Sequence, residues 1–351
     1  MTQTQLPIFG IFGHSGSGKT TLIEKLLARC RENGLDAAVA KFHAHGIDID
    51  REGKDSDRFF RTGADVYLQG PEQGFLRTHP ADDARNRSTL AEFARRHDVV
   101  LLEGRKQIAC EKIWLLGDDE SAPPDDVPDV LAVLNREADR GEIAWGILQN
   151  WLRRRWCEVP IFGCVLIGGK SQRMGTPKHL LTKSGTTWLE HTHACLGEVC
   201  ERVVVVGAGA LPEGLTQAMC LPDVTDADGP ASGLLAAMRW APEVSWLVAA
   251  CDLPDLSTEA LRWLLATRAP GVWGTLPRLR GRENVEPLLA HYDFRARALF
   301  DDLLAGGRSA PSRLAGHPKV ISPEPPEAVA AAWENVNTAK DLRRLGLDGT
   351  A

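Results

Sequence analysis

The stretch Gly13-His14-Ser15-Gly16-Ser17-Gly18-Lys19-Thr20 decides the fold of the first half of the chain. It has the spacing G-x-x-x-x-G-K-[ST] and stands between an apolar strand candidate, residues 8–12, and a helical stretch, residues 20–31. A phosphate-binding loop needs this context, because glycines let backbone N–H groups converge on a phosphate at a helix N-terminus. The lysine reaches the β- and γ-phosphate oxygens, and the threonine hydroxyl can bind Mg²⁺. The residues expected to bind a nucleotide are Gly13, Gly16, Ser17, Gly18, Lys19 and Thr20.

Strand candidates recur along the first half and alternate with helix-length segments. They lie at residues 37–42, 99–102, 113–116 and 130–134. This alternation predicts an α/β fold with a mostly parallel sheet covered by helices. Glu103 follows one of these strands, at the sheet edge where the phosphate loop lies, so we expect it to hold a metal-bound water as a Walker-B residue does. The alternative is an acidic residue that merely caps a strand.

A second glycine-containing stretch, of different design, opens the second half. After a strand candidate at residues 161–167, the chain reads Leu166-Ile167-Gly168-Gly169-Lys170-Ser171-Gln172-Arg173-Met174-Gly175-Thr176-Pro177-Lys178. It resembles the signature of nucleotidyltransferases with a Rossmann-like sheet. The paired glycines permit close approach of the backbone to base and phosphate. Arg173 and Lys178 are expected to neutralise the triphosphate and the charge that develops at the α-phosphorus.

Two aspartates in the second half are candidate site residues. Asp223 precedes Gly229-Pro230-Ala231-Ser232-Gly233-Leu234, whose glycines suit a tight passage into a helix. Asp252 follows a buried strand candidate at residues 246–250, where a carboxylate can hold Mg²⁺ against the α-phosphate. We predict that Asp252 is catalytic, together with Arg173 and Lys178. The alternative is a strand-end aspartate that starts the turn with Pro254.

Length and pattern predict two domains. The chain has 351 residues, and a domain of ordinary size holds about 150. The arginine-rich stretch 151–156 is typical of a solvated helix end, and a new strand candidate follows Pro160. We place the boundary near Cys157, which gives domains of residues 1–157 and 158–351, and no internal repeat relates them.

Composition argues against several classes of protein. A net charge of -6 and a pI near 6.0 give no basic field for nucleic acid. The eight cysteines form no C-x-x-C pair, so a zinc site is not expected. The N-terminus has no leader pattern, and no apolar stretch approaches the roughly 18 residues that span a bilayer. We therefore expect a cytoplasmic protein with no membrane and no nucleic-acid partner.

The first half resembles MobB, the GTP-binding adaptor of molybdenum cofactor biosynthesis. The likeness covers nearly all of residues 1–157 and rests on the phosphate loop, the His/Asp-rich segment 41–50, and the stretches 61–64 and 102–106. It implies that Asp48, Asp50 and Lys54 line the nucleotide or cofactor groove. It also implies GTP at the first loop, although a guanine-reading N-K-x-D is absent. The partners that it implies are molybdoenzymes or cofactor-insertion proteins, and a second copy of the chain in a homodimer formed through the N-terminal domain.

The second half resembles MobA, the molybdenum cofactor guanylyltransferase, over residues 160–345. That family joins GMP from GTP to molybdopterin and releases pyrophosphate. The likeness implies that GTP is bound by Leu166, Ile167, Gly168, Gly169, Lys178, Asp223 and Asp252, and that Mg²⁺ is bound by Asp252. Asn337 is either a second oxygen ligand to this metal or a helix cap.

Two departures from the MobA pattern leave alternatives open. Gly207 stands where the family often has asparagine, and Thr176-Pro177-Lys178 is similar to the cytidylyl relatives. The paired Gly168 and Gly169 favour the guanylyl enzymes, because the cytidylyl group carries Ala-Gly there. A cytidylyltransferase or sugar-nucleotide pyrophosphorylase therefore stays open, as does a nucleotide-regulated delivery protein whose second domain is catalytically idle.

Overall fold

A computed structural model describes residues 6–43, 50–79, 83–106, 108–168 and 177–336. The chain forms two compact units. The first holds the chain up to Glu32 and from Asp36 to Ile147, and the second holds Asn33–Leu35 and the chain from Leu148 onward. The division falls inside helix α4 (Arg140–Glu158), upstream of the boundary near Cys157 that the sequence suggested. A helix can pass from one core to the next with no linker composition to mark the change.

The first unit is built on a five-stranded parallel sheet of order β2-β5-β1-β6-β7. The mostly parallel sheet expected from the alternating pattern is confirmed. Strand β1 lies at the centre, which explains its continuous apolar run, because a central parallel strand is covered on both faces. The strands are β1 (Ile8–Gly13), β2 (Ala37–Lys41), β5 (Val99–Glu103), β6 (Lys112–Leu115) and β7 (Val130–Leu134).

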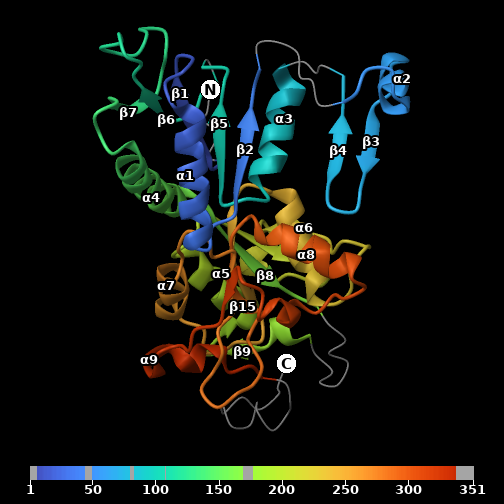
Figure 1. Ribbon diagram of the computed structural model, residues 1–351. Coiled ribbons are helices and arrows are strands. Elements are labelled where there is room, and N and C mark those ends of the chain that lie inside the picture. Colours follow the sequence, from blue (N-terminus) through green and yellow to red (C-terminus); the bar gives the residue numbers. More distant parts are fainter. Residues whose placement is uncertain (1–5, 44–49, 80–82, 107, 169–176, 337–351) are drawn as a thin grey trace. The chain divides into compact units, whose positions relative to one another are not determined.

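A hairpin beside helix α2 was not predicted from the sequence. Its strands β3 (Val66–Gln69) and β4 (Gly74–Arg77) pair only with each other and lie next to α2 (Asp55–Arg61) in the part of the chain that the structure describes (Figure 1). The strands are short, and most of their side chains are exposed, so they lack the apolar alternation that identifies a half-buried strand. Two further helices belong to this unit, α1 (Lys19–Glu32) and α3 (Asp83–Ala94).

The second unit contains a seven-stranded mixed sheet of order β12-β11-β8-β13-β15-β14-β16. The four neighbouring strands β12, β11, β8 and β13 are parallel to one another, and β15 is antiparallel to β13. Strands were expected at residues 161–167, 203–206 and 246–250, and the structure has β8, β11 and β13 there. The strands are β8 (Ile161–Leu166), β11 (Arg202–Val206), β12 (Met219–Leu221), β13 (Ser245–Ala250), β14 (Gly274–Thr275), β15 (Leu289–Tyr292) and β16 (Val320–Ile321).

Helices and short turns surround this sheet. The α-helices are α5 (Trp188–Gly197), α6 (Pro230–Trp240), α7 (Thr258–Ala266), α8 (Ala296–Ala305) and α9 (Glu327–Ala330). The 3₁₀ turns are η1 (Lys178–Leu180), η2 (Glu213–Leu215), η3 (Pro311–Leu314) and η4 (Ala331–Trp333), and a two-stranded ribbon is formed by β9 (Thr182–Lys183) and β10 (Thr186–Thr187). One core packs Val165, Val205 and Leu247 from the three central strands against α5 and α7.

The cysteines are all free, and they divide by burial. Cys30, Cys110, Cys164 and Cys251 are buried, as expected for small apolar side chains. Cys157 and Cys220 are exposed. Within the ranges that the structure describes, no helix combines the length and apolar character needed to cross a membrane.

A buried histidine in β15 is expected to make the second unit sensitive to acid. His291 is fully buried, and neither ring nitrogen has a hydrogen-bond partner among the described residues. Burial lowers the pKa of His291 from 6.5 to about 3, and the nearby positive charge of Arg268 acts in the same direction. The unfolded chain therefore binds this proton between about pH 6.5 and pH 3, while the folded chain does not.

Acidification is consequently expected to lower stability through this window. Between pH 6.5 and about pH 5 the free energy of unfolding should fall by about 2 kcal/mol from this group. The test is denaturant unfolding at both pH values for the parent chain and for His291→Leu, which has no proton to gain. An equal pH dependence in the two proteins would show that this histidine is not responsible.

Candidate nucleotide sites

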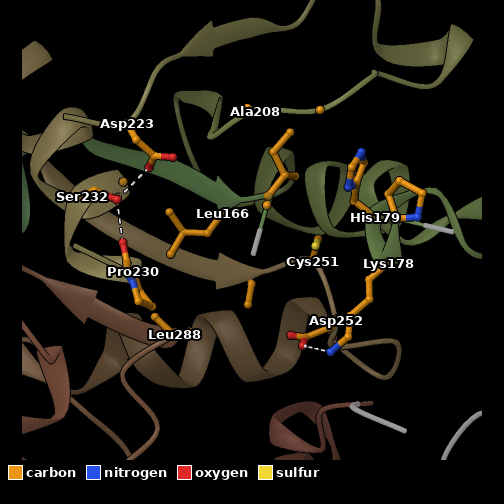
Figure 2. A pocket seen from close by; sticks show the side chains of 17 residues that line it. Leu166, Lys178, His179, Ala208, Asp223, Pro230, Ser232, Cys251, Asp252 and Leu288 are labelled. Atoms are coloured by element: carbon orange, nitrogen blue, oxygen red, sulfur yellow. Dashed lines mark hydrogen bonds and ion pairs between the residues drawn. The ribbon is translucent and has the colours of Figure 1, made fainter. Parts of the chain in front are cut away.

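The second unit contains a cavity of about 830 Å³ at the carboxyl ends of its parallel strands. Strand β8 supplies Leu166, the segment after β11 supplies Ala208 and Gly209, and Asp252 lies two residues beyond the end of β13 (Figure 2). The start of α6 supplies Pro230. Ligands of open α/β sheets bind at this edge, because the chain leaves the sheet there in opposite directions.

An ion pair joins two of the predicted catalytic residues in this cavity. Lys178 Nζ lies 2.9 Å from Asp252 Oδ2, although the residues are 74 positions apart in sequence (Figure 2). Pro177 starts the η1 turn that carries Lys178, and Cys251 N donates to Leu166 O at 3.2 Å, which fixes Asp252 beside the end of β8. Arg173, Gly169 and Asn337 lie outside the described residues.

Asp223 lies across the cavity and is tied to the start of α6. Ser232 Oγ is 3.0 Å from Asp223 Oδ1 and 2.6 Å from Gly229 O, so one hydroxyl serves two acceptors (Figure 2). Gly229 has a φ of 62°, and Pro230 then begins the helix. At Gly233 a Cβ atom would lie 2.7 Å from Leu166 Cδ2, so the helix packs closely on β8. Gly229 therefore lets the chain turn sharply into α6, and Gly233 lets the helix lie close to β8, as the sequence suggested.

His179 is a cavity residue that the sequence reasoning missed. Its Nε2 lies 2.9 Å from Ala210 O, and because a carbonyl can only accept, Nε2 carries the proton. The ring lies against Gly209, where a Cβ atom would be 2.7 Å from Cε1 and 2.9 Å from Nε2. The only sequence signal was its place directly after Lys178. Other lining residues had also been given no site role, among them Ala208, Ser232 and Leu288.

This contact predicts that a larger side chain at position 209 can be compensated by a smaller one at position 179. Gly209→Ala should weaken nucleotide binding in this cavity about tenfold, because the new methyl group displaces the histidine ring from the cavity wall. Adding His179→Ala removes the clash and should recover part of the lost affinity. Nucleotide titration at constant Mg²⁺, with Lys19→Ala as the background, measures both effects at this cavity. A double variant that binds no better than Gly209→Ala alone would contradict the packing argument.

The phosphate loop of the first unit lies where β1 passes into α1. Lys19 Nζ donates to Gly13 O at 3.0 Å and to His14 O at 2.8 Å. Gly16 and Gly18 have φ values of 75° and 91°, which favour glycine. Ser17 is buried in the loop, and Thr20 lies in the first turn of α1. All six residues predicted for this loop are therefore gathered in one strand–loop–helix segment.

Glu103 ends β5, the strand next to β1, as the sequence suggested. Its carboxylate is mostly buried, and Oε2 lies 3.2 Å from Lys41 Nζ at the end of β2. Burial lowers the pKa of Lys19, the negative charge of Glu103 acts against this shift, and Lys41 adds to it. Two lysines and one carboxylate are therefore close enough to interact at this sheet edge.

Asp50 and Lys54 line a smaller cavity of about 450 Å³ in the first unit. Asp50 accepts from Ser56 Oγ at 2.9 Å and pairs with Arg77 at 3.0 Å. Asp48, the third predicted groove residue, lies outside the described ranges. In the parts of the chain that are described, no three His, Cys, Asp or Glu side chains gather as a metal site.

Two protein families match the chain. The family described as molybdopterin guanine dinucleotide synthesis protein B matches residues 8–136, and the MobA-like NTP transferase domain matches residues 163–317. A probable molybdenum cofactor guanylyltransferase of Bacillus cereus is 30% identical over 186 residues, which are 51% of this chain and 92% of that protein. The molybdopterin-guanine dinucleotide biosynthesis adapter protein of Haemophilus influenzae is 35% identical over 162 residues, 42% of this chain and 90% of its own length.

Solved structures also match each part. Molybdopterin-guanine dinucleotide biosynthesis protein A from Archaeoglobus fulgidus has a TM-score of 0.42 and 23% identity, and the match covers 52% of this chain and 95% of that one. A molybdopterin-guanine biosynthesis protein B has a TM-score of 0.33 and 26% identity, with 42% and 99% covered. On the matches of family and sequence, both resemblances are confirmed: the chain belongs to the MobB family in its first part and to the MobA-like NTP transferases in its second, joined in one polypeptide.

Proposed function

We propose that the second unit transfers GMP from GTP to molybdopterin with release of pyrophosphate, and that the first unit is its GTP-binding adaptor. One observation carries the proposal. Lys178, Asp252 and Asp223, three residues expected for this activity, line one cavity at the carboxyl ends of β8, β11 and β13. The relatives named above, a guanylyltransferase and an adapter protein, support the same assignment.

The proposed reaction requires the protein to align two anions, the substrate phosphate and the triphosphate of the nucleotide. The attacking group is a substrate phosphate that is already ionised, so no enzyme nucleophile or general base is required. Lys178 offsets the charge on the triphosphate, and Arg173 is proposed to do the same. Asp223, held by Ser232, fixes the nucleotide at the start of α6. The glycines at 168 and 209 let the backbone approach the ligand closely.

Asp252 fits a magnesium ion. It offers a hard carboxylate oxygen to the cavity, and within the described residues only Oδ2 is engaged, by Lys178. When bound, Mg²⁺ would neutralise phosphate charge and polarise the α-phosphoryl oxygen. Asn337 is proposed as a second ligand. In the first unit, Thr20 and Glu103 are the residues proposed to hold the corresponding ion.

A nucleotide competition assay tests the reaction. The full chain is given molybdopterin and Mg²⁺ with GTP, CTP or ATP, and pyrophosphate release is measured. Turnover with GTP alone supports the proposal. Turnover with CTP would assign the chain to the cytidylyl relatives, in keeping with Thr176-Pro177-Lys178, and binding without turnover would favour a delivery protein.

The adaptor role concerns the first unit. We propose that its phosphate loop binds a second GTP and that its partners are molybdoenzymes or cofactor-insertion proteins in the cytoplasm, with a homodimer formed through this unit. Sedimentation of the full chain and of residues 148–351, which hold the second unit apart from Asn33–Leu35, would test the dimer. Equal association states of the two proteins would argue against a contact through the first unit.

A further inference from the structure

Two arginines from the segment after β7 bind consecutive carbonyls of the first phosphate loop. Arg136 Nη2 donates to Gly16 O at 2.8 Å, and Arg140 Nη1 donates to Ser17 O at 2.6 Å. They come from more than 100 residues further along the chain and reach the loop because β7 belongs to the same sheet as β1. Neither residue belongs to the phosphate-loop motif.

Arg140 is held firmly in this position. Its Nη2 donates to Leu116 O at 2.7 Å and to Leu134 O at 2.9 Å, where β6 and β7 end, and its Nε donates to Asn135 O at 2.7 Å. Burial lowers the pKa of Arg140, and the like charge of Arg136 acts in the same direction. The rigid, planar fork of N–H donors in arginine suits this arrangement, whereas lysine has a single nitrogen.

Arg136 is anchored on its other side by an acid. Its Nε lies 3.0 Å from Asp118 Oδ1, in the segment that follows β6. Arg136 and Arg140 thus connect the phosphate loop to the ends of β6 and β7, the two strands on this side of β1. The loop is rich in glycine and would otherwise have many backbone conformations open to it.

The direction of a carbonyl determines the direction of the next N–H. In a trans peptide the C=O of one residue and the N–H of the following residue point opposite ways. Fixing Gly16 O therefore orients Ser17 N–H, which also makes a long 3.3 Å contact with His14 O inside the turn. Fixing Ser17 O orients Gly18 N–H, directly before α1 begins at Lys19.

We propose that Arg136 and Arg140 are positioning residues of this nucleotide site. They hold the two peptide planes on either side of Ser17, so that Gly18 N–H faces the β-phosphate of the nucleotide while Ser17 N–H closes the turn on His14 O. The inference rests on the proposed binding of GTP to the first unit. It explains how a loop of glycines keeps a binding geometry, since charge-assisted hydrogen bonds are stronger than neutral ones.

The test is calorimetric titration of the full chain with GTP and with GDP at constant Mg²⁺. Lys19→Ala identifies the binding component that belongs to the first loop. Arg140→Lys should weaken that component about 10- to 100-fold for both nucleotides, which corresponds to the loss of one or two charge-assisted hydrogen bonds. Arg136→Met should also weaken the Lys19-dependent component for both nucleotides. The GTP component that survives Lys19→Ala should keep its affinity in both variants.

Arg153→Met is the matched control, because this arginine is exposed on α4 and contacts no loop carbonyl among the described residues. Wild-type affinity at the Lys19-dependent component in both Arg140→Lys and Arg136→Met would overturn the inference. If Arg140→Lys fails to fold, the more exposed Arg136 decides the matter alone. If Lys19→Ala removes no GTP component, the proposed GTP binding fails instead, and the two failures are distinct.

Discussion

Asp252→Asn is expected to lower pyrophosphate release from GTP by about 1,000-fold or more. The substitution keeps the shape of the side chain but removes its charge, so the ion pair with Lys178 Nζ and the proposed magnesium ligand are lost together. Removing one electrostatic group from a transition-state site commonly costs 10²- to 10³-fold, and this position would combine two such roles. The measurement is the rate of pyrophosphate release with GTP, Mg²⁺ and molybdopterin.

Two control variants test whether the loss of activity depends on the charge at position 252 or follows from any change of charge in the chain. Asp226→Asn removes an acid of the same unit that pairs with Arg239 at 2.7 Å on the exposed surface, and it should leave the rate unchanged. Lys19→Ala should keep most of the transfer activity, because that lysine lies in the first unit. A rate for Asp252→Asn within tenfold of the parent would remove Asp252 from the mechanism.

Gly207→Ala is expected to lower the free energy of unfolding by about 3 kcal/mol and to abolish GTP binding in the second unit, the component that survives Lys19→Ala. The φ of Gly207 is 116°, and a Cβ atom there would lie 2.0 Å from Ile167 O. That oxygen belongs to the backbone beside the cavity, so no side-chain rotation can relieve the contact. Denaturant unfolding and GTP titration measure the two effects.

The same geometry explains a departure from the MobA pattern. Asparagine, which that family often has at this position, would meet Ile167 O as alanine does, so Gly207→Asn should be equally damaging. The matched control is Gly197→Ala at the end of α5, where an added Cβ meets no atom within 4 Å and φ is not positive. That variant should be neutral or slightly stabilising. A stable Gly207→Asn variant that still binds GTP in the second unit would show that the two strand ends can separate.

Local spacing placed candidate residues in both sites. Lys19 and Asp252 could be proposed from the sequence because each proposed role depends on residues close in sequence, a glycine loop or the end of a strand. His179 and Arg140 were not, because their contacts join segments 31 and 123 residues apart. Such contacts become visible only once the order of strands in a sheet is known. The β3–β4 hairpin was missed for a related reason, since its short strands carry little apolar pattern.

An alkylating reagent should react with only some of the cysteine thiols in the folded protein, because the thiols differ in burial. Burial raises the pKa of Cys30 and Cys251 to about 12 and that of Cys110 to about 11, so little thiolate forms at neutral pH. The exposed Cys157 and Cys220 are open to a reagent. Iodoacetamide should label these two first and the core thiols only as the chain opens, so mass spectrometry can follow unfolding without any engineered cysteine.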